Sequence, residues 1–409
     1  MSDPYAVLRI PDFRFFISAR FFVTLAIQIQ GVVVGYQVYE ITKDPFSLGL
    51  IGLAEAIPSI VVSLYAGHVA DIVMRKKIIV WCLSTLLAVS ASLLFFTTDP
   101  GAFLLNYGAL PIYTVIFISG IARGFLTPAN FSFMPQLVPR ELFPGAVTFN
   151  STIWEIASIG GPALGGLMYA FLGITAAYVA DVTLTAAGLM LILNVASKPL
   201  PPESEEQGMV EKITAGLRFV FNNKTVLAAI SLDLFAVLFG GAVALLPIFA
   251  DQVLHVGAFG FGVLRAAPSI GALVIAFVVM HNPIKKNMGR LLLWCVAGFG
   301  FCMIGFGLSK NFWLSLFLLI ASGGFDCISV IIRFTILQTF TPENMKGRVS
   351  AVNNIFVGSS NEIGMFESGV AAKAMGVVPS VIFGGCMTVG VVGLISWLAK
   401  SLRRLQNVS

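Results

Sequence analysis

The chain alternates between long apolar stretches and short polar breaks. Stretches such as "GALVIAFVVM" (271–280) and "WLSLFLLIAS" (313–322) contain no charged residue. A strand of a membrane barrel would alternate apolar and polar residues, whereas runs of about twenty apolar residues are typical of membrane-spanning helices. The pattern predicts about twelve spans, which cover residues 15–39, 47–70, 78–97, 110–138, 145–171, 174–196, 224–251, 258–281, 289–308, 312–340, 347–374 and 378–400.

Composition supports this interpretation. Of the 409 residues, 57% are hydrophobic and 11% are charged, whereas a soluble domain carries about 25% charge. So few polar residues could not cover the surface of a soluble protein of this size. We therefore predict an all-α membrane protein, with the lipid bilayer as the solvent for most of the chain.

Other classes of function are disfavoured. The cations form short clusters between apolar runs, which does not favour nucleic-acid binding, and the first residues carry Asp3 and Asp12, unlike a signal peptide. The five cysteines lie inside predicted spans without metal-ligand spacing, so we expect packing roles and neither a metal nor a cofactor. An enzyme is disfavoured because the sequence shows no nucleophile–base spacing. A channel is disfavoured because no segment resembles a selectivity filter.

Positive charges divide unevenly between the polar breaks. Nineteen of the 25 Lys and Arg residues fall on one side of the predicted helices, three lie inside spans, and the other side holds only Lys43, Lys310 and Lys373. Because Lys and Arg concentrate in cytoplasmic loops, the bias predicts a multi-pass protein of the cell membrane with both termini in the cytoplasm. The triplet Arg75–Lys77 then lies in a cytoplasmic loop.

The two halves of the chain resemble each other. "EAIPSI" at 55–60 recurs as "RAAPSI" at 265–270, and "SGIARGF" at 119–125 matches "SGGFDCI" at 322–328 through Ser-Gly. Matches in the same order across several spans indicate a parallel repeat of two six-span halves, which is a known transporter plan.

The longest polar stretch, "SKPLPPESEEQGMVEK", separates the halves. It is followed by residues 209–222, which place Val210, Ile213, Leu217 and Phe221 on one face, a pattern typical of a helix lying on the membrane surface. We predict an N-terminal six-helix bundle over 1–197, a cytoplasmic linker with a surface helix over 198–223, and a C-terminal six-helix bundle over 224–409.

The loop "GHVADIVMRKK" (67–77) interrupts the apolar pattern most sharply. Gly67, Asp71, Arg75 and Lys76 match the signature loop between the second and third helices of the major facilitator superfamily, although Met74 stands where that family usually has glycine. The chain therefore resembles this superfamily over nearly its whole length. The resemblance implies a monomeric secondary transporter for a small molecule.

Three further motifs narrow the resemblance. "FLTPANFSFMPQLVP" (125–139) and "TPENMKGRVSAVN" (341–353) resemble the drug:proton antiporter group, which includes the enterobactin exporter and macrolide efflux pumps. "GGPALGG" (160–166) resembles the antiporter Gly-Pro motif, whose members here are Gly161, Pro162, Gly165 and Gly166. A packing kink and a role in transport direction are both open for this motif, because glycines allow close helix approach and proline loosens the helix.

The signature loop also suggests a gate. An acid beside a cation cluster at a helix end can form a contact that breaks and re-forms. We predict that Gly67, Asp71, Arg75 and Lys76 act with Arg348, at the start of the eleventh helix, whose N-terminus would favour the charge of Asp71. The alternative is that Asp71 is merely solvated at the membrane edge.

Ionisable residues inside spans are candidates for function because they are costly in a bilayer. They are Glu55, Glu155, Asp181, Asp233, Asp326, Glu362, Glu367, Arg123, Arg265 and Arg333. Arg123 and Asp326 occupy equivalent positions in the repeat, as do Asn130 and Arg333, and Glu55 and Arg265. The resemblance implies that the fourth and tenth helices line the substrate cavity.

Asp326 is the predicted proton-coupling acid and Glu362 the second candidate. Burial disfavours a charged carboxyl group and a nearby arginine favours it, so an acid that alternates between these environments takes up and releases a proton. The other candidates for coupling or for the substrate cavity are Arg123, Arg333, Asn130, Glu55 and Arg265. Static ion pairs that hold the bundle together are the alternative interpretation of these charges.

We therefore expect a transporter that exports a small amphipathic compound by alternating access, in exchange for protons. A lysophospholipid flippase, a facilitator and a nutrient importer are the alternatives within transport. A non-transporting receptor or scaffold is disfavoured by the short loops.

Overall fold

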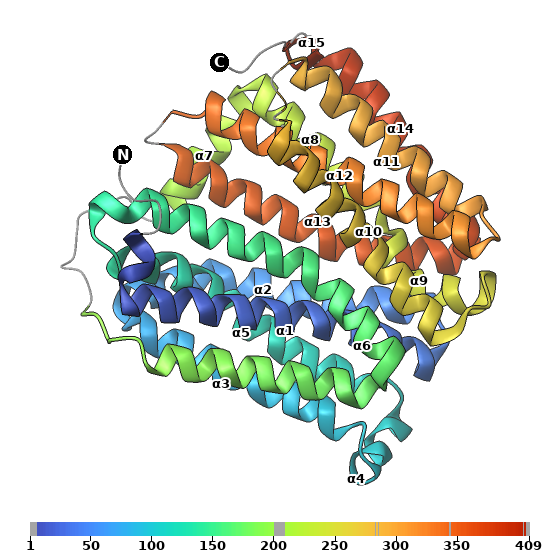
Figure 1. The fold of residues 1–409 in the computed structure, drawn as a ribbon, viewed down its shortest axis with the longest axis horizontal. Coiled ribbons are helices and arrows are strands. Elements are labelled where there is room, and N and C mark those ends of the chain that lie inside the picture. Colours follow the sequence, from blue (N-terminus) through green and yellow to red (C-terminus); the bar gives the residue numbers. More distant parts are fainter. Residues whose placement is uncertain are drawn as a thin grey trace. The chain divides into compact units, whose positions relative to one another are not determined.

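The computed structural model describes residues 6–199, 209–282, 284, 286–342, 345–403 and 405. The described part of the chain is helical and contains no strand, which confirms the predicted all-α class (Figure 1). The long helices are α1 (Pro11–Thr42), α2 (Pro45–Ile72), α3 (Arg75–Phe95), α5 (Leu110–Phe133), α6 (Phe143–Leu193), α7 (Met209–Asn222), α8 (Lys224–Phe239), α10 (Gly257–His281), α11 (Met288–Leu308), α12 (Phe312–Phe340), α13 (Lys346–Met375) and α14 (Val377–Leu398). Short helical segments connect them: η1 (Ala6–Arg9), α4 (Asp99–Ala102), η2 (Phe103–Tyr107), η3 (Met134–Gln136), η4 (Arg140–Leu142), η5 (Gly241–Val243), α9 (Leu246–Ile248), η6 (Phe249–Val253) and α15 (Lys400–Arg403).

The longest helix, α6, contains two of the predicted spans. Gly173 interrupts it with φ 82° and ψ 175°, outside the helical region. Glycine adopts such a conformation readily because it has no Cβ atom. The interruption falls between the predicted spans 145–171 and 174–196.

Each of the predicted spans has a helix in the structure, although over the predicted span 224–251 the helix α8 ends at Phe239 and the short segments η5, α9 and η6 follow. Within the described residues, nine helices are long and apolar enough to cross a membrane, and α6, with its break, is one of these. The short helix α8 passes the same test only together with the last turns of α7, from which it is bent by 102°. The remaining predicted span corresponds to α13, which carries Glu362 and Glu367 and is not among the nine. These helices together confirm an architecture of about twelve spans.

The chain divides into two compact units. Unit 1 consists of Met1–Thr42 and Leu53–Glu205, and unit 2 of Lys43–Gly52 and Glu206–Ser409. In unit 1, α1 packs along α6, and α3 packs on both α5 and α6 (Figure 1). In unit 2, α10 packs on α12, α11 lies between α12 and α14, and α13 packs on α8. The predicted domain limits remain a prediction, since the start of α2 clusters with unit 2.

Large apolar side chains occupy the outer surface as well as the core. Unit 1 has a buried cluster that includes Phe16 and Phe133, whose rings meet edge to face at 5.9 Å. In contrast, Trp294, Trp313 and Trp397 are each more than 70% exposed. Exposed apolar surface on this scale is expected where lipid is the solvent.

The predicted surface helix coincides with α7. Leu217 and Val220 pack in a small apolar cluster with Val226, while Phe221 is exposed. The exposed ring of Phe221 is compatible with a helix that lies on a membrane surface, and this location of α7 stays a prediction. The side chains of Val210 and Ile213 lie outside the described residues.

Candidate functional site

The signature loop connects α2 to α3 and is fastened to the end of α6. The ammonium group of Lys76 donates hydrogen bonds to the carbonyls of Leu193 (2.9 Å) and Val195 (2.6 Å). Arg75 donates from Nε to the carbonyl of Ala70 at 3.3 Å, within the same loop. Both cations of the motif thus hold backbone carbonyls in unit 1. The side chains of the other predicted gate members, Asp71 and Arg348, and the surroundings of Gly67 lie outside the described residues.

Asp12, near the start of α1, also binds the segment that follows α6. Its carboxylate pairs with Lys198 at 2.8 Å and accepts a hydrogen bond from the backbone N–H of Ala196 at 2.9 Å. The chain leaving α6 is therefore bound to α1 as well as to α3. Lys76 and Asp12 together fix the cytoplasmic end predicted for this bundle.

Glu55 on α2 and Arg123 on α5 form an ion pair inside unit 1. Close approach of the two helices permits it, because a Cβ atom at Gly120 would collide with the carbonyl of Glu55, and one at Gly124 would lie 2.8 Å from the carbonyl of Ser59. Small residues allow helix backbones to approach in this way. Two of the predicted site residues are therefore direct partners, which sequence reasoning did not specify.

Unit 2 repeats this helix contact with different charges. A Cβ atom at Gly323 on α12 would collide with the carbonyl of Pro268 on α10. Gly323 and Pro268 are the repeat equivalents of Gly120 and Pro58, the latter being a residue of α2 that also lies against Gly120. The repeat inferred from short sequence matches is thus present in the packing inside each unit.

At two pairs of repeat-equivalent positions, unit 2 carries the opposite charge to unit 1. Arg265 stands on α10 where α2 has Glu55, and Asp326 stands on α12 where α5 has Arg123. Arg265 is half-buried and forms no ion pair with the described part of the chain. Asp326 is an exposed residue of α12.

Arg333 lies two turns beyond Asp326 on the same face of α12, and it pairs with Asp233 of α8. Both residues are almost completely buried: Arg333 is 3% exposed and Asp233 is 5% exposed. Asp233 was among the intramembrane acids but was not assigned to the site. Its spacing in the sequence gives no signal for the pairing, because α8 and α12 are about a hundred residues apart.

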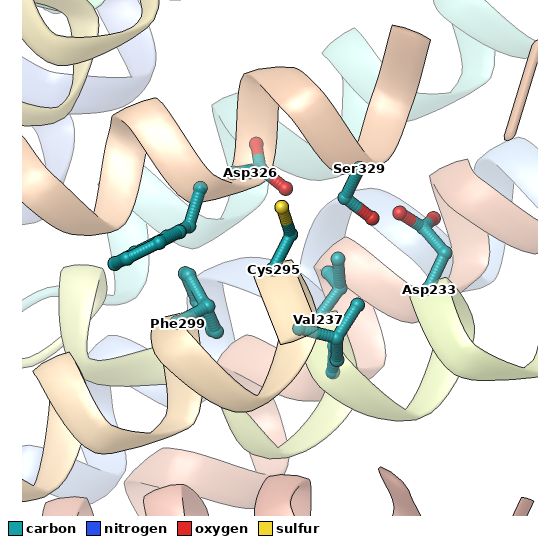
Figure 2. Close-up of a pocket in the computed structure, with 9 residues that line it drawn as sticks. Asp233, Val237, Cys295, Phe299, Asp326 and Ser329 are labelled. Atoms are coloured by element: carbon teal, nitrogen blue, oxygen red, sulfur yellow. The ribbon is translucent and has the colours of Figure 1, made fainter. Parts of the chain in front are cut away.

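A small pocket joins these residues in unit 2. Asp233, Cys295, Asp326 and Ser329 lie around it, with Val237 and Phe299 on its apolar side (Figure 2). Its free space suits about one water molecule. Acidic side chains from α8 and α12 and one hydroxyl group therefore line the same small space, together with mostly apolar residues.

The remaining candidates have separate surroundings. Asn130 is buried on α5, two turns beyond Arg123. Glu362 is half-buried on α13, and a Cβ atom at Gly52 would lie 2.6 Å from its backbone carbonyl.

The Gly-Pro motif lies where α6 crosses α1. A Cβ atom at Gly161 would collide with Cβ of Gln28, and one at Gly165 would lie 3.0 Å from Cα of Ile29. Pro162 stands inside the helix between them and Gly166 is buried. This geometry accounts for the glycines by close packing of α1 on α6. A role in transport direction stays a hypothesis.

Comparisons with known proteins agree with the motifs. A sequence model of the family described as "transmembrane secretion effector" matches residues 2–408. The chain is 27% identical over 400 residues to the enterobactin exporter EntS of Citrobacter koseri, covering 97% of this chain and 94% of that protein. It is 28% identical over 345 residues to EntS of Escherichia coli strain ED1a, covering 84% and 80%.

The fold is similar to that of solved transporters. A D-xylose–proton symporter superposes with a TM-score of 0.71 at 14% identity, covering 96% of this chain and 97% of that one. At such low identity the likeness concerns the fold alone.

Proposed function

The chain belongs to the transmembrane secretion effector family of the major facilitator superfamily, and from this premise we propose that it exports a small amphipathic compound in exchange for protons. It is a multi-pass transporter of the cell membrane and not an enzyme. Alternating access between two repeat halves is the general mechanism of such proteins. The predicted orientation, with both termini in the cytoplasm, and the monomeric state are parts of the proposal.

The substrate class is proposed from the relatives and from one cation. Proteins similar along almost the whole chain are named enterobactin exporters, so a siderophore of this kind is the first compound to test. Arg265 supports a substrate with an acidic or strongly hydrogen-bonding end, because a half-buried guanidinium group with no ion pair in the described part of the chain can bind one.

The environment of Asp326 carries the proposal of proton coupling. Arginine has no acceptor and stays charged, so Arg333 favours the ionised form of Asp233. Asp326 is an exposed residue of α12 that lines the same water-sized pocket and sits in an apolar span. A carboxyl group in mostly apolar surroundings, with a second acid and a hydroxyl group nearby, can exchange its proton as these surroundings change. Glu362 on α13 remains the second candidate.

Reconstituted vesicles test the proposal. Purified protein in lipid vesicles should accumulate enterobactin when a pH gradient is imposed, and a protonophore should abolish the accumulation. Dyes and lysolipids serve as the comparison panel, and protein-free vesicles serve as the control. Transport that ignores the pH gradient would contradict antiport and favour a facilitator, and movement of lysolipids alone would favour a flippase.

A further inference from the structure

Asp181 lies deep inside unit 1 among neutral polar groups. It is 1% exposed on the second half of α6. Gln30 of α1 donates a hydrogen bond from Nε2 to its carboxylate at 3.0 Å, and Ser90 of α3 and Thr185 of α6 are also hydrogen-bonded to it. In the described part of the chain, no Lys, Arg or His forms an ion pair with Asp181. An ionised carboxylate without a counter-charge is costly to bury, so this arrangement calls for a physical reason.

The partners of Asp181 suit both protonation states of a carboxyl group. Hydroxyl groups of Ser and Thr donate and accept hydrogen bonds, and the amide of Gln has both a donor and an acceptor. Gln30 also donates to Ser90 Oγ at 3.3 Å, so these partners are connected to each other. Asp233, the other deeply buried acid, differs because its partner Arg333 can only donate.

Further polar groups continue between α1 and α6 towards one end of the helices. Tyr178 donates to Gln37 at 2.6 Å, and Tyr169 donates to Glu40 at 3.2 Å. The ring of Tyr36 lies against that of Tyr169, with centroids 4.3 Å apart and the planes tilted by 49°. Glu40 is exposed, whereas the other members of this set are buried. The set, which we call the α1–α6 polar ladder, thus leads from an exposed carboxylate to the neighbourhood of Asp181.

Few titratable groups face Asp181 across this contact. Tyr178, one turn earlier on α6, is the titratable neighbour, while α1 presents Gln30 and α3 presents Ser90. Neither of the packed helices α1 and α3 therefore brings a described cation to the carboxylate. The protonation state of Asp181 depends on burial and on these neutral partners.

We propose that Asp181 is a proton-binding site of this transporter, separate from Asp326 and served by the α1–α6 polar ladder. The ladder marks a polar approach from the exposed Glu40 end, and a proton taken from water forms an O–H bond on the carboxylate of Asp181. It is released to water when that bond breaks. The coupling role of the site rests on the proposed proton exchange, but the binding of the proton does not.

The test uses the purified full-length protein in lipid nanodiscs, without substrate. Infrared difference spectra between acidic and alkaline buffer report the C=O stretch of protonated carboxyl groups. We expect the wild type to show a band from a buried carboxyl group that titrates with pH, and Asp181→Asn to lack it. Glu141→Gln, which removes an exposed carboxyl group in η4, is the matched control and should keep the band. Identical titrating bands in the wild type and Asp181→Asn would overturn the proposal.

A milder variant guards against misfolding of Asp181→Asn. Ser90→Ala removes one hydrogen-bond partner of the carboxyl group, so the C=O stretch of the band should change in frequency while the band itself remains. An unshifted band would count against the assignment. Asp326→Asn should leave the band in place, and its disappearance would assign the signal to unit 2 instead. If the band titrates while vesicle transport ignores the pH gradient, the proton site stands and the proposed antiport fails.

Discussion

Lys76, at the start of α3, donates a 2.6 Å hydrogen bond to the backbone carbonyl of Val195, just beyond the end of α6. The last carbonyls of a helix have no partner within the helix, and a cation is favoured at this end by the helix dipole. The cation triplet, which we interpreted as a topology signal, therefore also has a structural role. One of its members fastens α3 to the end of α6 inside unit 1.

Replacement of Lys76 should weaken unit 1. Lys76→Ala removes two hydrogen bonds from a charged donor, so we expect a loss of about 1–2 kcal/mol in the free energy of unfolding. Thermal unfolding in detergent, followed by tryptophan fluorescence, measures the change. Lys77→Ala, at the exposed neighbouring position, is the control and should be close to neutral. Equal losses for the two variants would contradict the capping role.

Breaking the buried ion pair in unit 2 should be more damaging. Arg333→Met leaves the carboxylate of Asp233 buried without its partner, and loss of one member of a buried pair typically costs about 3–5 kcal/mol. The double variant Asp233→Leu with Arg333→Met should recover much of that stability, because no charge is left uncompensated. Unfolding midpoints of the single and double variants in detergent decide the matter. A double variant as unstable as the single one would show that the pair is not the cause.

The exposed acid of unit 2 should control coupling. Asp326→Asn mimics the protonated form, so pH-driven accumulation of enterobactin in vesicles should fall to the level of protein-free vesicles. Exchange of labelled for unlabelled enterobactin across the membrane needs no net proton movement and should persist. If Asp326→Asn accumulates substrate normally and Glu362→Gln does not, the coupling acid lies on α13.

The orientation of the chain can be read with cysteine labelling. The cation bias predicts that Lys77 and Lys286 face the cytoplasm and that Lys43 and Lys310 face outside, and all four side chains are exposed. Single cysteines at these positions, in a background without the native cysteines, should react with an impermeant reagent from opposite sides. Lys77 is chosen because the neighbouring Lys76 is hydrogen-bonded to the end of α6 and its replacement would disturb unit 1. Labelling of Lys77→Cys in intact cells would overturn the topology.

The long apolar runs in the sequence were sufficient to locate the helices. A bilayer requires long apolar runs and satisfies no exposed backbone, so most span limits follow closely from the sequence, down to the break that Gly173 introduces in α6. The span predicted over 224–251 is the exception, because α8 ends at Phe239. The internal repeat was also visible, since "EAIPSI" and "RAAPSI" mark the helix pairs that approach closely in each unit. The intramembrane charges could be recognised as candidates because each is costly in lipid.

The partners of these charges could not be recognised from the sequence. Glu55 pairs with Arg123, Asp233 with Arg333, and Asp181 with neutral groups from α1, α3 and α6. The repeat predicted none of these contacts, and it places opposite charges at equivalent positions. By itself, the sequence determined how many helices the chain forms and which residues are costly to bury. Only the tertiary structure decided which acid faces an arginine and which faces neutral hydrogen-bonding groups, because helix rotation and crossing depend on packing between segments far apart in the chain.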